Sequence, residues 1–334
     1  MLKKINSLQE GFKLEWFVFA FMGMIFYSVA GLLDKYLLSS YTYDSNAYIV
    51  CQVLASQLFT IPVFFLAGAN FVYPQSLFAL LFGSLQILPC FYYMKALEIE
   101  EISKVSALEY IYPLFVFLGS ALLLGEVLEI RHCAGGLLIL VGTLLISYNK
   151  NSSDRIDLYN NGFNNNCLIS KPFVRFIGNL SPAIRPFILY WVLTAVYYLS
   201  MKYLLISIDE WDLYVWSSLG SLIAVLPLIV IPSIRSEVKG FFTKNGFAVG
   251  ALISEETFQF LGIIFSIFAY AVGSVSLVSS IGALQPIMTV LIVLGLGILT
   301  PKLANVIDEK TDWCSLKQKG ISFLTVAIGI YCVS

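Results

Sequence analysis

The chain consists mainly of long apolar runs separated by polar connections, and this pattern constrains its fold more than any other feature. A helix that crosses a hydrocarbon core of about 30 Å needs about 20 predominantly apolar residues. Unpaired backbone groups are costly in lipid, so such runs must be helical. We therefore predict an all-α membrane protein with ten transmembrane helices. Their approximate limits are 15–36, 46–67, 75–97, 103–125, 132–148, 185–206, 212–232, 247–271, 274–299 and 317–334.

The composition agrees with a membrane-embedded body and excludes other classes. Hydrophobic residues make up 58% of the chain and charged residues 12%, against about 25% charged in soluble domains. The net charge of -1 leaves no basic excess for binding nucleic acid. The six cysteines form no CxxC pair and there is one histidine, so we expect neither a metal site nor another cofactor. We predict a multi-pass protein of the cell membrane whose partners are the lipid bilayer and a small molecule.

A polar, asparagine-rich stretch at 149–184 separates the apolar runs into two groups of five. It predicts a linker between two domains, 1–148 and 185–334. The sequence Lys-Tyr-Leu-Leu at 35–38 recurs at 202–205, in each case at the end of the first apolar run of its half. This recurrence indicates an internal repeat.

Two further matches between the halves occur in the same order along the chain. Because five is an odd number of helices, a second copy must enter the membrane in the opposite orientation, which predicts two inverted five-helix repeats. The matching elements are Val105-Ser106 and Pro113 with Val278-Ser279 and Pro286, Gln86 with Gln259 in the same register, and 142–147 with 329–334.

Basic residues indicate the orientation of the chain in two opposite ways. Most Lys and Arg residues lie on the side that carries the 149–184 stretch, which the positive-inside rule places in the cytoplasm. Lys3, Lys4 and Lys13 at the N-terminus favour the other orientation. At the level of the sequence the orientation stays open.

Several short motifs between residues 95 and 147 follow one another in a characteristic order. They are Lys95-Ala96-Leu97, Ser103 to Ala107, Pro113-Leu114-Phe115, Leu122 to Glu126 and Gly135 to Gly142. In these motifs the chain resembles the EamA-type transporters of the drug/metabolite transporter superfamily, and the second half resembles them more loosely. The resemblance implies ten helices in two inverted five-helix units, transport of small solutes by alternating access, and cytoplasmic termini.

Glu255 and Glu256 are the main candidates for a functional site, because charges are expensive in hydrocarbon and are functional by default. Adjacent helical positions differ by about 100°, so one of the two can face a cavity while the other packs. A carboxylate in this position could bind and release a proton or bind a cation. In the alternative interpretation the helix begins nearer 257 and both carboxylates lie at the membrane interface.

Glu109 is a further candidate, because it lies one turn before Pro113 where the cavity-lining helix of the resembled family begins. In the alternative interpretation it is an interfacial carboxylate beside Lys104. Other polar or aromatic side chains of the spans could contact substrate, although aromatic residues also fill membrane cores and interface belts. These candidates are Gln259, Tyr93, Tyr110, Trp191 and Tyr197.

For other residues of the spans we predict structural roles. Lys35 and Lys202 at equivalent helix ends are expected to snorkel to the lipid headgroups, and Glu126 is expected at a turn between helices. Glycines such as Gly142 and Gly295 favour close helix contacts, within the fold or between subunits of a homodimer. Prolines inside spans free backbone carbonyls and favour kinks. We predict such kinks at Pro89, Pro113, Pro227 and Pro286.

From these features we predict a secondary active transporter that exports a small organic metabolite by alternating access, with proton coupling through Glu255 or Glu256 as a subordinate hypothesis. The chain carries no glycine-rich nucleotide-binding motif. The alternative is a membrane scaffold or sensor that uses the same fold without transport. An intramembrane enzyme is disfavoured, because no Ser/His pair or spaced set of carboxylates converges in the sequence.

Overall fold

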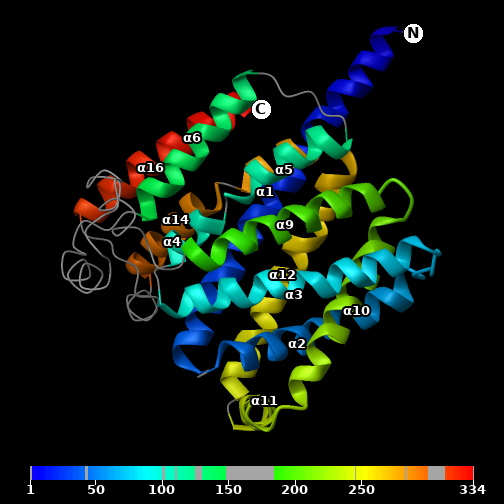
Figure 1. Ribbon diagram of the computed structural model, residues 1–334, viewed down its shortest axis with the longest axis vertical. Helices are drawn as coiled ribbons and strands as arrows, with labels where there is room; N and C mark the ends of the chain where they lie inside the picture. The colour runs from blue at the N-terminus through cyan, green and yellow to red at the C-terminus, as the bar shows by residue number, and fades with distance from the viewer. Residues whose placement is uncertain are drawn as a thin grey trace, which may run out of the picture.

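The computed structural model describes residues 2–41, 44–99, 102–109, 111–124, 130–147, 184–244, 246–282, 284–299 and 313–333, and its regular elements are all helices (Figure 1). In the first half these are α1 (Leu2–Ser40), α2 (Ser45–Leu66), α3 (Gln75–Ile99), α4 (Ile102–Glu109), α5 (Tyr112–Gly119), the π-helical η1 (Ser120–Leu124) and α6 (Ile130–Ser147). In the second half they are α9 (Ile184–Leu204), α10 (Glu210–Ile229), α11 (Pro232–Lys244), α12 (Gly246–Val272), α13 (Val275–Gly282), α14 (Gln285–Leu299) and α16 (Trp313–Val333).

Seven helical segments of the described residues are long and apolar enough to cross a membrane. This confirms the prediction of an all-α, multi-pass membrane protein. The prediction of ten crossings is not confirmed by these seven segments and stays a prediction. The seven segments are Glu15–Ser40, Ser45–Leu66, Gln75–Glu98, Phe187–Leu204, Glu210–Ile229, Gly246–Val272 and Val275–Leu296.

Two of the four prolines predicted to kink a helix instead begin one. Pro113 is the second residue of α5, after α4 has ended at Glu109, and Pro286 is the second residue of α14, after α13 has ended at Gly282. A proline lacks the N–H donor and its ring clashes with a preceding carbonyl, but in the first turn of a helix it is tolerated. Pro89 and Pro227 lie inside α3 and α10 as predicted.

Helix α11 was expected to be part of a polar connection, but residues 232–244 form an amphipathic helix at one end of the molecule (Figure 1). Its buried residues Ile234, Val238 and Phe241 recur at helical spacing and pack against α2 and α12. Glu237 accepts a hydrogen bond of 3.0 Å from the backbone N–H of Asp44. With 13 residues the helix is too short to cross a bilayer.

Small residues let α3 and α10 approach until their backbones touch. A Cβ atom on Gly83 would overlap the backbone of Ser217, and one on Gly220 would overlap the backbone of Leu80. Ser84 donates to the Gly220 carbonyl at 2.8 Å, and Ser221 donates to the Gly83 carbonyl at 2.9 Å. Such reciprocal contacts between small residues are typical of helix pairs in membranes.

The α6 and α16 helices form a side-by-side pair at the edge of the bundle (Figure 1). Gly142 of α6 lies against Val326 and the Ser322 carbonyl of α16, as expected for a close contact, whereas the position of Gly295 faces open space. The remaining helices surround the centre of the bundle, where α1 packs against α12 and α3 packs against α9.

Candidate functional site

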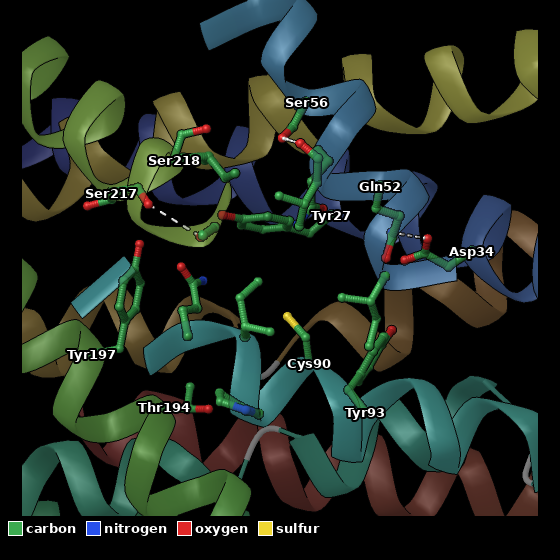
Figure 2. A pocket seen from close by; sticks show the side chains of 18 of the residues that line it. Tyr27, Asp34, Gln52, Ser56, Cys90, Tyr93, Thr194, Tyr197, Ser217 and Ser218 are labelled. Carbon is green, nitrogen blue, oxygen red and sulfur yellow. Dashed lines mark hydrogen bonds between the residues drawn. The ribbon is translucent and has the colours of Figure 1, made fainter. Parts of the chain in front are cut away.

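A cavity of about 230 Å³ lies between the two halves of the molecule (Figure 2). Its walls come from α1, α2, α3 and α4 of the first half and from α9, α10, α12 and α14 of the second. The wall is rich in groups that can donate or accept hydrogen bonds. These include Tyr27, Asp34, Gln52, Ser56, Gln86, Cys90, Tyr93, Glu109, Thr194, Tyr197, Ser217, Ser218, Glu256, Gln259 and Gln285.

Asp34 is the carboxylate that α1 contributes to this wall. One of its oxygens accepts two hydrogen bonds, from the Tyr48 hydroxyl at 2.8 Å and from the Gln52 amide nitrogen at 2.8 Å. Both donors come from α2, and the Gln52 bond is drawn in Figure 2. The Asp34 side chain is buried, and these two donors hold its carboxylate in a fixed orientation.

Glu255 and Glu256 are both buried, and the alternative in which their helix begins nearer 257 is wrong. The α12 helix begins at Gly246, which puts both residues more than two turns inside it. Glu256 lines the cavity, whereas Glu255 is fully buried behind the wall. Asp34 and Gln52 lie beside Glu255, but neither forms a hydrogen bond of normal geometry with it. The helical offset between adjacent residues thus places one carboxylate in the cavity and one in the packing.

Glu109, at the C-terminal end of α4, also lines the cavity. Its carboxylate accepts a hydrogen bond of 2.8 Å from the Tyr190 hydroxyl of α9. Glu109 therefore lies in the cavity wall, as its interpretation as a functional candidate predicts. The side chain of Lys104, its expected neighbour, lies outside the described residues.

The other sequence candidates divide into cavity residues and packing residues. Gln259, Tyr93 and Tyr197 line the cavity. Trp191 does not line it, because its ring stacks on Phe115 and its Nε1 donates to the Leu108 carbonyl at 2.7 Å, which joins α9 to α4. Tyr110 lies outside the described residues, as do Glu126 and residues 148–183 of the predicted linker.

Comparison with known proteins agrees with this arrangement. Residues 14–148 match the EamA-like transporter family. This match agrees with the resemblance of residues 95–147 to the EamA-type transporters. One solved crystal structure is 17% identical, covers 95% of this chain and 95% of its own, and superposes with a TM-score of 0.60, so the two share a fold. No curated protein matches the chain.

The family match and the seven membrane-length helices are consistent with a multi-pass integral membrane protein. Within the EamA-like segment, sequence reasoning missed Asp34 and Gln52. The predicted first span, 15–36, ended just after Asp34, but α1 continues to Ser40 and places this residue inside the helix. A polar residue inside an apolar run, such as Gln52 in 46–67, was the signal that could have identified this wall.

The prediction that Lys35 and Lys202 snorkel to the headgroups is wrong. The Lys35 ammonium donates to the carbonyl of Leu97 near the C-terminal end of α3. The Lys202 ammonium donates to the carbonyls of Tyr270 at 2.7 Å and Gly273 at 2.8 Å, at the C-terminal end of α12. The last carbonyls of a helix lack partners within it and carry partial negative charge, so an ammonium group there is stabilised.

Proposed function

We propose that the protein is a secondary active transporter that exports a small organic metabolite by alternating access. In this proposal two inverted five-helix repeats, 1–148 and 185–334, are joined by the linker 149–184 and give ten transmembrane helices. The observation that carries the proposal is the polar cavity between the halves of a chain whose residues 14–148 match a transporter family. Alternating access requires a binding site that each side of the membrane can reach in turn, and a cavity between two repeats meets this requirement.

The pairing of helices supports the inverted repeat. The first helix of each half packs against the third long helix of the other, as α1 does with α12 and α9 does with α3. Equivalent helices also contact each other directly, as α2 does with α10 and α6 does with α16. A twofold relation between the halves would produce both kinds of contact.

Equivalent local features support the same proposal. Lys35 and Lys202 bind the ends of α3 and α12, and each half contains a helix break just before a matched proline, Pro113 or Pro286. A homodimer also remains a prediction. Many apolar side chains are exposed on the surface of the protein, and they could contact either lipid or a second copy of the chain.

Topology can be tested with single cysteines placed in a cysteine-free background. With five crossings per half, Asn160→Cys in the linker and Lys310→Cys before the last helix lie on the same side of the membrane. We expect a membrane-impermeant maleimide added to intact cells to label both or neither. Labelling of one alone would contradict two five-helix repeats.

Transport and proton coupling can be tested together in liposomes. The purified protein should release preloaded metabolites from a broad panel, and an imposed proton gradient should accelerate the release. Glu255→Gln with Glu256→Gln should remove the response to the gradient, because an amide cannot exchange a proton with the cavity. Glu15→Gln, which replaces an exposed glutamate, is the control for loss of a carboxylate elsewhere in the chain.

An unchanged flux in the double variant would refute proton coupling through these residues. No flux for any metabolite, together with a stable partner in pull-down experiments, would favour the scaffold or sensor instead.

A further inference from the structure

The cavity wall carries acidic side chains without any basic counterpart among its described lining residues. Asp34, Glu109 and Glu256 line it from α1, α4 and α12, and no Lys, Arg or His is among the residues around it. Lys35, next to Asp34 in the chain, directs its ammonium group to the Leu97 carbonyl. Acidic side chains buried in a membrane protein normally pair with one another or with a bound cation.

The three carboxyl groups lie around the same part of the cavity, near Cys90. Cys90, which also lines the cavity, lies within electrostatic reach of Asp34, Glu109 and Glu256. Figure 2 shows Cys90 with Tyr93 on one side and Asp34 beyond it. A positively charged group near Cys90 would therefore be attracted by carboxylates from both halves of the chain.

An unused hydrogen-bonding group points to a ligand independently of the charges. Thr194 lines the cavity from α9, is 7% exposed, and its hydroxyl has no hydrogen-bond partner (Figure 2). A buried hydroxyl without a partner costs free energy. A bound ligand that offers a hydrogen-bonding group could satisfy this hydroxyl.

Aromatic rings in the cavity wall favour an organic cation over a metal ion as the ligand. Tyr27, Tyr93, Tyr197 and Tyr214 line the cavity together with Phe260. Their faces attract cations and their edges and faces pack against apolar groups. Among the described residues, no three His, Cys, Asp or Glu side chains form a group suited to a metal ion.

We infer that this cavity binds a small organic amine in its cationic form, with the ammonium group near Glu256 and Asp34 and an apolar body against the tyrosines. The inference names a substrate class and rests on the proposed function. Glu256 serves as the principal counter-charge, since Asp34 already accepts two hydrogen bonds and Glu109 accepts one from Tyr190.

Three probes of similar shape and different charge test the inference: phenethylamine, 2-phenylethanol and 3-phenylpropionate. Binding is measured on the purified full chain in detergent by the shift in unfolding temperature. Protection from N-ethylmaleimide of a protein in which Cys90 is the only cysteine reports on the cavity itself. We expect half-maximal effects at about tenfold lower concentration for the amine than for the alcohol, and none for the carboxylate.

Variants locate the effect. Glu256→Gln should raise the amine concentration needed for both effects about tenfold, whereas Glu256→Asp should retain most of the affinity and Glu15→Gln all of it. Equal protection by the alcohol, protection by 3-phenylpropionate, or unchanged amine binding in a folded Glu256→Gln protein would overturn the inference.

A liposome assay separates this inference from the proposed function. Its probe is radiolabelled phenethylguanidinium, which keeps its N–H donors and stays charged at neutral pH, so that it leaks slowly through lipid. Flux of neutral or anionic metabolites without binding of the amine would leave a transporter and refute the cationic substrate. Binding of the amine that depends on Glu256, without flux of any compound, would support the site and refute transport.

Discussion

The proposed inverted repeat pairs positions of the two halves that carry different charges. Lys35 and Lys202 hold the ends of α3 and α12 in the same way. The residue before each lysine differs, since Asp34 in the first half corresponds to Met201 in the second. Asp34 lines the cavity, whereas Met201 is buried and does not line it.

The glutamates show the same contrast. The register that pairs Gln86 with Gln259 places Glu256 opposite Gly83, the residue that lets α3 touch the backbone of Ser217. It also places Glu109 opposite Gly282. The Gly83 position therefore serves packing in the first half, and the matched Glu256 position serves the cavity in the second. The halves share a single cavity, so one set of acidic residues is enough.

The strongest way to break the comparison is to move the charge to the other half. Met201→Asp would bury an unpaired carboxylate, which costs about 3 kcal/mol within a membrane helix. We expect the variant to unfold at a much lower temperature in detergent or to fail to accumulate. The reciprocal Asp34→Met should fold and lose transport. A stable Met201→Asp protein would show that the two positions do not differ in their surroundings.

A packing position should respond to volume. Gly83→Ala would place a methyl group on the backbone of Ser217 and force α3 and α10 apart, at a cost of about 1–3 kcal/mol. Thermal unfolding of the purified protein measures this effect. Gly250→Ala is the matched control, because open space surrounds that helical glycine. Equal stability of the two variants would contradict the close approach of α3 and α10.

The two lysines sharpen the shared part of the comparison. Lys35→Met and Lys202→Met each remove the donor to buried or partly buried helix-end carbonyls, which costs about 1–3 kcal/mol. We expect both variants to lose stability by similar amounts in denaturation experiments. A loss confined to one of them would argue against equivalent roles in the two repeats.

The smallest effects are expected at the matched glutamines. Gln86 and Gln259 both line the cavity, so replacing either by Ala removes one potential hydrogen bond to the substrate, worth about 1 kcal/mol. Each variant should raise the substrate concentration for half-maximal flux by a few-fold and leave the unfolding temperature nearly unchanged. Opposite responses at the two positions would extend the asymmetry from charges to neutral polar groups.

Much of the fold could be predicted from the sequence, because the length of an apolar run and the need to pair every backbone group both demand a helix. The breaks before Pro113 and Pro286 were less accessible, since a proline inside an apolar run is compatible with a kink or with a new helix. The α11 helix was missed because its few apolar residues were interpreted within a short charged segment.

The sequence by itself determined that the chain enters a membrane as helices and that Glu255, Glu256 and Glu109 were unusual charges in apolar surroundings, and it predicted that the halves repeat each other. Only the tertiary structure decided that Asp34 belongs beside them and that Trp191 packs away from the cavity. The physical reason is that a helix apolar on all sides does not reveal which face turns inward. Residues far apart in the chain define that face only when the helices pack together.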